Sequence, residues 1–350
     1  MSFPTPRFSR TQVQRAGELL ISDDGVDDLA KWLNAFEVLS NWRACHGYPI
    51  NTFQATLRTK LKKIDATALV AQRLKRTPSI LNKLTRFPGM SLSRMQDIGG
   101  LRAVVSSPAQ LNVLYIDYKQ TNFTHALVSE YDYVNQPKTS GYRSIHLVYK
   151  YKLRKQSPYD GLQIELQLRT KLQHAWATAV ETVGTFLEHS LKSSEGPDEW
   201  LKFFSLVSSA FAHLEKTPLV PGYETLSKEE TFINTTNEAA RLGVRNLLMG
   251  YSSAVQAIPS SGLRSAYYLV ELELGGPSKN VNITPFSRDR LEEANIRYSE
   301  LEQEVAKGKS AQVVLVAAGS IDSLKRAYPN YFLDTHEFLK HLEKIRRHSS

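Results

Sequence analysis

Four short clusters of charged and polar residues between Arg73 and Thr170 have the residue types that a polyphosphate site needs. In the first cluster, Lys75, Ser79 and Lys83 recur every four residues. Apolar spacing predicts a helix over residues 66–87, on which these three side chains would share one face. Such a row of donors suits phosphate oxygens, because hydrogen bonds between charged partners are the strong ones. A solvated basic helix face is the alternative that this cluster leaves open.

Two further clusters place carboxylates near basic residues on predicted strands. Asp97 stands at the start of one strand, and Arg102 follows five residues later. A turn aspartate and a surface arginine are the alternative reading of that pair. Along another predicted strand Glu165, Gln167 and Arg169 alternate, so their side chains point to the same face. Polar groups in register on a central strand would be costly unless they faced a wet cleft.

The remaining cluster is a loop between two predicted strands. Pro137 and Gly141 favour the loop, and Tyr142 stands at its tip, just before strand periodicity resumes. An aromatic ring in that position is well placed to stack on a base, a contact worth about 1–3 kcal/mol. A hairpin turn with an incidental tyrosine is the alternative.

The 350 residues are 41% hydrophobic and 23% charged, a globular composition that excludes a disordered, collagen-like or coiled-coil chain. Lys and Arg number 44 against 35 Asp and Glu, and residues 1–90 hold 14 of the former against 7 of the latter. This surplus is compatible with a polyanionic partner. The single Cys45 excludes a disulfide framework and a cysteine-based zinc site within one chain. With no apolar run long enough for a membrane span and no readable secretory signal, we expect a cytoplasmic protein without a membrane partner.

The elements that must position these clusters are predicted as follows. Helices occupy most of the first ninety residues, and strands follow at 98–106, 127–134, 144–152 and 162–168, with a crossover helix at 108–121. Two prolines and a glycine in residues 217–223 mark a linker, after which one long helix is expected over 228–258. A smaller α/β unit has strands at 266–274, 281–286 and 312–318. We therefore expect a domain over 1–220, a linker and long connecting helix over 221–262, and a C-terminal domain over 263–350.

In their order and spacing the four clusters resemble the synthetase domain of the RelA/SpoT family, over roughly residues 60–215. The family pattern reads approximately R-x-K-x-x-x-S-x-x-x-K, D-x-x-x-x-R, P-K-x-x-G-Y-x-S-x-H and E-x-Q-x-R-T. This chain matches it at Arg73, Lys75, Ser79, Lys83, Asp97, Arg102, Pro137, Lys138, Gly141, Tyr142, Ser144, His146, Glu165, Gln167, Arg169 and Thr170. The resemblance implies an α/β (α+β) fold, with a mixed-sheet, nucleotidyltransferase-like synthetase core flanked by helices.

The family transfers a β,γ-pyrophosphate from ATP to the 3′-hydroxyl of a ribose and releases AMP. Carried over to this chain, the resemblance implies that Arg73 and Arg102 sandwich the adenine of ATP. It also implies that Lys75, Ser79 and Lys83 hold the ATP phosphates.

The same resemblance assigns the catalytic and acceptor-binding residues. Asp97 and Glu165 look like the ligands of a Mg²⁺ cofactor, and Glu165 or Gln167 would orient the attacking hydroxyl. The acceptor-binding residues would be Lys138, Gly141, Tyr142, Arg143 and His146, with Tyr142 stacked on the acceptor base.

Members of the family differ in their acceptor: GDP or GTP, adenosine nucleotides, or the 3′-CCA end of tRNA in toxin-type members. Two basic runs favour tRNA, because contacts of lysine and arginine with phosphates anchor nucleic acids. These candidate tRNA-binding residues are Arg58, Lys60, Lys62, Lys63, Lys150 and Lys152. None of the nine histidines is followed by Asp, so the HD hydrolase of long family members is not expected.

Near the C-terminus, Tyr328-Pro-Asn-Tyr331 resembles the YxxY element of fused toxin–antitoxin members, the CapRel-like anti-phage proteins. That resemblance implies a pseudo-zinc-finger-like C-terminal domain that places Tyr328 or Tyr331 over the ATP site. A phage protein such as a major capsid protein would bind this domain and release the enzyme. A pair of core tyrosines at a helix end is the alternative.

The resulting expectation is an autoinhibited toxin that pyrophosphorylates tRNA and blocks translation, monomeric by analogy with the fused forms. An alarmone synthetase that uses GDP, GTP or adenosine nucleotides is the second hypothesis. A catalytically silent nucleotide- or RNA-binding module is the third.

Overall fold

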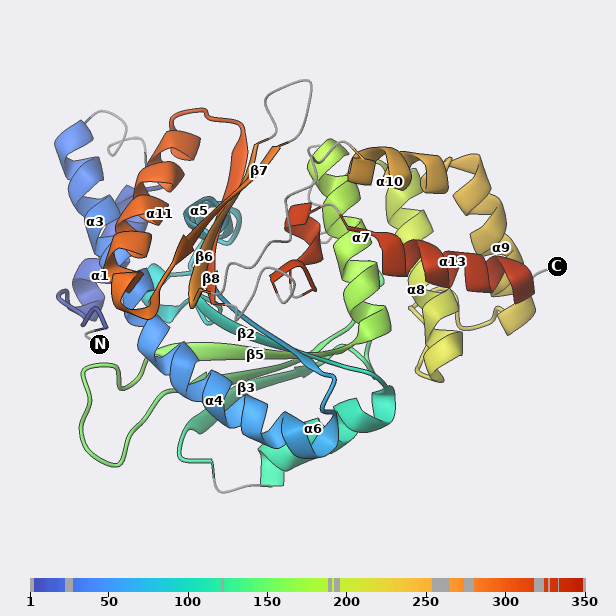
Figure 1. Ribbon diagram of the computed structural model, residues 1–350, viewed down its shortest axis with the longest axis horizontal. Coiled ribbons are helices and arrows are strands. Elements are labelled where there is room, and N and C mark those ends of the chain that lie inside the picture. The colour runs from blue at the N-terminus through green and yellow to red at the C-terminus, as the bar shows by residue number, and fades with distance from the viewer. Residues whose placement is uncertain are drawn as a thin grey trace.

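The computed structural model describes residues 3–22, 28–120, 123–187, 191, 196–253, 265–273, 280–317, 324–326, 328–332 and 334–348. Within these ranges the centre of the molecule is an eight-stranded mixed sheet with the order β3-β4-β5-β2-β1-β8-β6-β7 (Figure 1). The strands are β1 (Leu69–Leu74), β2 (Gly99–Val105), β3 (Ala126–Asp132), β4 (Ile145–Lys150), β5 (Gln163–Thr170), β6 (Tyr267–Glu273), β7 (Asn280–Phe286) and β8 (Ala311–Ala317).

Helices flank the sheet and form a separate cluster at one side (Figure 1). They are α1 (Arg10–Leu19), α3 (Leu29–Cys45), α4 (Gly47–Ile64), α5 (Thr77–Arg86), α6 (Pro108–Gln120), α7 (Lys171–Leu187), α8 (Asp198–Glu215), α9 (Lys228–Arg241), α10 (Val244–Ser253), α11 (Leu291–Ala306) and α13 (His336–His348), with 3₁₀ turns η1 (Leu92–Arg94), η3 (Arg288–Arg290) and η4 (Pro329–Phe332). None of the helices in the described part of the chain is long and apolar enough to cross a membrane.

The pairing of β2 with its neighbours sets the geometry of the site. β2 runs parallel to β5, and their register places Gly100 beside Glu165 and Arg102 beside Gln167. On its other side β2 runs antiparallel to β1, which places Arg102 opposite Ala71. Residues that are paired in register point to the same face of a sheet. Polar side chains of three neighbouring strands therefore gather on one face.

The opposite face of these strands carries the larger apolar core. Leu101 of β2 and Ile164 and Leu166 of β5 are fully buried and pack in one cluster with Leu57 of α4. In Figure 1, α4 and α6 cover this face, whereas α7 rises from the other. The apolar residues thus fix α4 against the sheet and leave the polar face for chemistry.

The C-terminal strands continue the same sheet. β8 pairs with β1 through Arg73 and Val316, and β6 lies between β8 and β7. α11 packs on β6 and β8, while α13 returns to the helices α7 and α9. Phe338 of α13 lies 5.8 Å from Phe211 of α8 between ring centroids. The division into domains at residues 220 and 262, and a zinc-finger-like character of residues 263–350, stay predictions.

The prediction of a helix over residues 66–87 is wrong for the first half of that range. The structure has strand β1 there, followed by α5, which begins at Thr77 and carries Pro78 in its first turn. Proline suits the start of a helix because its missing N–H is not needed there. Pairing of β1 with β2 along six residues outweighs the local helical spacing. Lys75 consequently precedes α5, and Lys75, Ser79 and Lys83 do not form a stripe along one helix.

The single long helix expected over 228–258 is also corrected, because the structure has α9 and α10 in its place. Gly243 separates them with a φ of 59°, a left-handed conformation that glycine adopts without strain. A capping box between Ser227 and Glu230 fixes the start of α9 as expected for this sequence pattern. Residues 254–258 lie outside the described ranges.

Candidate active site

The polar face of the sheet forms a small, partly open cavity. β1, β2 and β5 supply most of its lining, the C-terminal segment supplies one residue, and Asp97 stands just before β2. The lining residues are Ala71, Arg73, Asp97, Gly100, Leu101, Arg102, Glu165, Gln167 and Tyr328. The two carboxylates predicted to share one cation, Asp97 and Glu165, therefore open into one cavity, together with both arginines predicted to hold adenine.

Asp97 lies between two lysines. Its carboxylate accepts hydrogen bonds from Lys75 Nζ at 2.6 Å and from Lys83 Nζ at 3.0 Å. Burial alone would raise the pKa of Asp97, but attraction to the two ammonium groups outweighs burial and lowers the pKa to about 2. Burial in turn lowers the pKa of Lys75, against the opposing effect of Asp97. Asp97 is thus ionised and lies between two ammonium groups.

Glu165 belongs to a closed ring of hydrogen bonds. Its Oε1 lies 2.7 Å from His146 Nδ1, and its Oε2 accepts from Gln167 Nε2 at 2.8 Å. The ring continues as Arg169 Nη2 donates to Gln167 Oε1 at 3.1 Å and to Tyr142 Oη at 2.6 Å. Tyr142 Oη closes it, 2.8 Å from His146 Nε2. Because a carboxylate only accepts, His146 donates through Nδ1 in either protonation state.

The ring also sets the charge of its members. Burial would lower the pKa of His146, but nearby Tyr142 and Glu165 outweigh burial and raise it. Burial would raise the pKa of Glu165, yet the hydrogen bond and charge of His146 lower it. The hydrogen bonds from His146 and Gln167 therefore favour the ionised form of Glu165 and hold one carboxylate oxygen each.

Tyr142 does not stand exposed at a loop tip, which corrects the sequence prediction. Its side chain is only 8% exposed, and Arg169 Cζ lies 5.1 Å from its ring centroid. The ring packs into a helical core with Trp176 and Phe204. The phenol of Tyr142 hydrogen-bonds to His146, which in turn bonds to Glu165, so Tyr142 supports Glu165. Its stacking on an acceptor base stays a prediction.

Arg143 was also predicted to contact the acceptor, and the structure corrects its position. It is 4% exposed, and its Nε donates to Ser208 Oγ of α8 at 2.9 Å, while Nη1 donates to the Val134 carbonyl at 3.2 Å. Burial lowers its pKa to about 10. Arg143 therefore anchors the loop to α8 instead of facing a ligand.

Gly141 and Lys138 have different roles in the same loop. Gly141 has a φ of 87°, and a Cβ atom there would lie 2.8 Å from Ser208 Cβ, so only glycine fits against α8. Lys138 is exposed, and its Nζ lies 4.4 Å from the ring centroid of Tyr133. The same Nζ lies 5.6 Å from the ring centroid of Tyr142, so this surface cation contacts two tyrosine rings.

The two arginines of the predicted adenine clamp lie on the same face, diagonally across β1 and β2. Arg73 pairs in register with Gly100, and Arg102 pairs with Ala71. Both arginines line the cavity. Burial and nearby Arg169 lower the pKa of Arg102 to about 10, which still leaves it charged at neutral pH.

Tyr328 reaches this clamp from the C-terminal part of the chain. It is 3% exposed, lines the cavity with Arg73 and Arg102, and donates its hydroxyl to the backbone carbonyl of Gln72. Tyr328 directly precedes η4, and its backbone N–H donates to the Leu324 carbonyl at 2.9 Å. The backbone of Tyr331 is in η4, but its side chain lies outside the described part, so its predicted blocking role stays a prediction.

Ser79, predicted to hold the ATP phosphates, lies in the first turn of α5.

The basic residues predicted to bind tRNA do not converge on the cavity. Lys60 pairs with Asp117 of α6 at 2.5 Å, and Arg58, Lys62 and Lys63 are exposed on the same helix α4. Since α4 packs on the apolar face of the sheet, the sheet separates these residues from the cavity (Figure 1). Lys150, the last residue of β4, and Lys152, two residues later, are also exposed.

Two site residues were not assigned a role from the sequence. Arg169 is 1% exposed yet binds both Gln167 and Tyr142, and its alternation with Glu165 was the signal that could have found it. Tyr133, whose ring centroid is 5.4 Å from that of His146, has no signal in the sequence because the β3–β4 pairing brings it there.

Comparison with known proteins agrees with this site. Residues 72–185 match the family described as "Region found in RelA / SpoT proteins", and this segment contains the cavity residues from Arg73 to Gln167. The matched segment makes up about a third of the chain's length.

Two proteins of Bacillus subtilis (strain 168) are similar over that part. GTP pyrophosphokinase YjbM is 35% identical over 125 residues, which cover 35% of this chain and 54% of that protein. GTP pyrophosphokinase YwaC is 29% identical over 113 residues, which cover 30% and 52%. The chain thus spans about half the length of the curated relatives it matches. The crystal structure of the small alarmone synthetase 1 from Bacillus subtilis bound to its product pppGpp is 27% identical, with a TM-score of 0.40, and the match covers 48% of this chain and 90% of that one.

Proposed function

We propose that this protein is a pyrophosphokinase that transfers the β,γ-pyrophosphate of ATP to a ribose 3′-hydroxyl. The observation that carries the proposal is the single cavity in which Asp97 and Glu165 face Arg73 and Arg102. Acidic groups for a cation and planar cations for a purine are the two halves of an ATP site. The relatives named GTP pyrophosphokinase support the same reaction class.

The chain's residues would act mainly by positioning and by neutralising charge. Lys75 and Lys83, now paired with Asp97, would turn to the ATP phosphates as these enter. Asp97 and Glu165 fit Mg²⁺, because hard cations take one or two carboxylates and fill the remaining positions with water and phosphate. Each carboxylate oxygen that accepts one hydrogen bond keeps a lone pair for the cation. When bound, Mg²⁺ would neutralise the phosphate charge, while Glu165 or Gln167 orients the attacking hydroxyl.

For the acceptor, we propose the 3′-CCA end of tRNA, so that the enzyme is a toxin that stops translation. The support is Tyr328 in the cavity, where a tyrosine of a fused toxin–antitoxin protein would block adenine. The exposed cations that would contact this acceptor are Lys138 in the loop, Lys150 at the end of β4 and Lys152 just after β4. Arg58, Lys60, Lys62 and Lys63 would require the tRNA to reach around the sheet.

A second candidate is an alarmone synthetase that uses GDP or GTP. It is favoured by the names of the two relatives, both GTP pyrophosphokinases. To separate the two, γ-labelled ATP is offered with deacylated tRNA, with GDP and with GTP in parallel reactions. Label on tRNA alone supports the toxin, whereas label on GDP or GTP alone refutes it. The matched control is a tRNA whose terminal adenosine lacks the 3′-hydroxyl, which should accept no label.

Autoinhibition follows from the same proposal. Tyr328 would keep adenine out until a phage protein, such as a major capsid protein, binds the C-terminal residues and withdraws it. Purified capsid protein added to the full chain should raise AMP release, and the same protein added to a Tyr328→Ala chain should raise it little. Equal stimulation of both chains would count against Tyr328 as the brake.

A further inference from the structure

A buried polar cluster joins three helices that are distant in the sequence. Arg43 of α3 and Glu302 of α11 form an ion pair at 2.7 Å, and their side chains are 4% and 2% exposed. Glu302 Oε1 accepts the backbone N–H of Thr77 at 2.9 Å, and Arg43 Nη1 also donates to Thr77 Oγ1 at 2.7 Å. Tyr298, one turn before Glu302, donates its hydroxyl to the same carboxylate, and Arg43 Cζ lies 4.3 Å from its ring centroid.

Thr77 is the first residue of α5, so Glu302 supplies the cap that this helix lacks locally. The preceding Arg76 makes no side-chain cap, and Pro78 has no N–H to offer. The first N–H groups of a helix need acceptors, and its positive end favours a carboxylate. A buried carboxylate in turn requires several donors, which Thr77, Arg43 and Tyr298 provide. The cap of α5 therefore comes from 225 residues further along the chain.

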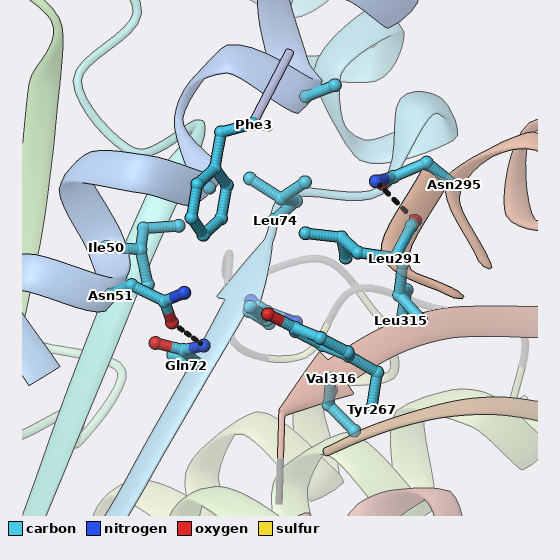
Figure 2. A pocket seen from close by; sticks show the side chains of 13 residues that line it. Phe3, Ile50, Asn51, Gln72, Leu74, Tyr267, Leu291, Asn295, Leu315 and Val316 are labelled. Carbon is cyan, nitrogen blue, oxygen red and sulfur yellow. Dashed lines mark hydrogen bonds between the residues drawn. The ribbon is translucent and has the colours of Figure 1, made fainter. Parts of the chain in front are cut away.

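The C-terminal strands contact the rest of the sheet at a second place. In the described part of the chain β8 pairs with β1 at Arg73 and Val316, and Ala71 of β1 packs in one apolar cluster with Tyr268 and Val316. Beside this seam lies a small pocket, where Figure 2 shows Phe3 and Ile50 on one side facing Leu291 and Tyr267 on the other. The polar cluster is a separate contact, and through it α11 is joined to the start of α5.

From this geometry we propose that Glu302 is a positioning residue for ATP binding, an inference that rests on the proposed function. Glu302 fixes the first turn of α5, which begins two residues after Lys75 and carries Ser79 and Lys83. The C-terminal part of the chain then has two opposite effects: Tyr328 occupies the cavity, and Glu302 completes it. Activation requires Tyr328 to leave while α11 stays docked.

Two double variants of the full chain isolate the cap. Arg43→Met/Glu302→Gln and Arg43→Met/Glu302→Leu both remove the buried charges, and only the glutamine can still accept the Thr77 N–H. We expect the KM for ATP to be about 10-fold higher in the leucine variant than in the glutamine variant, the size of a lost helix cap, with kcat similar in both. Amide exchange of residues 77–84 should be faster in the leucine variant. Equal KM and equal exchange in the two variants would overturn the proposal.

Tyr298→Phe is the milder second variant, because it keeps the ring over Arg43 and removes only the hydroxyl. It should raise the KM for ATP about 2- to 3-fold, as expected for one hydrogen bond, and speed exchange at Thr77. Unchanged exchange and KM would contradict the positioning role. The exchange measurement needs no substrate, so it decides the cap even if the chain releases no AMP, a result that would refute the proposed function separately.

Discussion

The hydroxyl of Tyr328 donates a hydrogen bond to the backbone carbonyl of Gln72, which lies between two residues of the cavity wall, Ala71 and Arg73. A residue close to the C-terminus is thereby fixed inside a site built from the first half of the chain. Gln72 lies in β1, the strand that carries Arg73 of the proposed adenine clamp. In the proposed mechanism β1 would therefore contact ATP in the active state and Tyr328 in the inhibited state.

Replacing Tyr328 with alanine should activate the enzyme and weaken the fold. Loss of the buried ring costs about 3 kcal/mol of unfolding free energy, yet AMP release should rise about 10-fold or more as adenine gains the clamp. Tyr328→Phe is the matched control, because it keeps the ring and loses only the bond to Gln72, so its rate should lie between those of wild type and Tyr328→Ala. An alanine variant that folds but is no faster than wild type would argue against the blocking role.

The His146–Glu165 pair predicts how stability depends on pH. The pKa of His146 is raised above 6.5, so its contribution is complete below pH 6.5 and is lost as pH rises through the raised value. The pKa of Glu165 is lowered below 4.5, so its contribution is complete above pH 4.5 and is lost as pH falls through the lowered value. His146→Gln should therefore reduce the unfolding free energy more at about pH 5.5 than at about pH 8.5. Denaturant titrations at both pH values test this, and an equal loss at both would show that the pair is not ionic.

Tyr142 must be tested with two substitutions, because its ring is buried. Tyr142→Ala should destabilise the chain by about 3–5 kcal/mol, so its inactivity would say little about the acceptor. Tyr142→Phe keeps the packing and breaks the ring of hydrogen bonds at Arg169 and His146. We expect it to fold with a kcat about 10-fold lower and an unchanged KM for ATP, since it loosens Glu165 and not the adenine clamp. A phenylalanine variant with wild-type kcat would mean that the ring of hydrogen bonds does not support catalysis.

Gly141 and Gly222 form a natural pair for separating steric clash from backbone strain. Both have positive φ, 87° and 94°, but a Cβ at Gly222 meets nothing within 4 Å, whereas at Gly141 it meets Ser208 and Trp176. Gly222→Ala should cost about 1 kcal/mol, and Gly141→Ala about 3 kcal/mol or more. Thermal unfolding of the two variants measures the difference, and equal costs would mean that the loop is not packed against α8.

More of the cavity residues than of the elements and contacts that hold them in place could be predicted from the sequence. Alternation in β5 was enough to place Glu165 and Gln167 on one face, because strand alternation is a local property. The register of β2 with β5, which no local pattern gives, adds Arg102 to that face. By contrast β1 was mistaken for helix, since its conformation is decided by β2 and β8, which are distant in the sequence. The inward fold of Tyr142 and the capping of α5 by Glu302 likewise depend on partners that no local pattern reveals.

The most direct test of the central claim is the nucleotide product of γ-labelled ATP in the Tyr328→Ala chain, compared with the same chain carrying Asp97→Asn. If Asp97 and Glu165 serve one pyrophosphate-transfer site, the label moves to the acceptor as AMP appears in equal amount, and Asp97→Asn lowers the rate by about 1000-fold, as loss of a key electrostatic group does. Release of ADP in place of AMP, or an Asp97→Asn chain as fast as its parent, would contradict this assignment of the cavity.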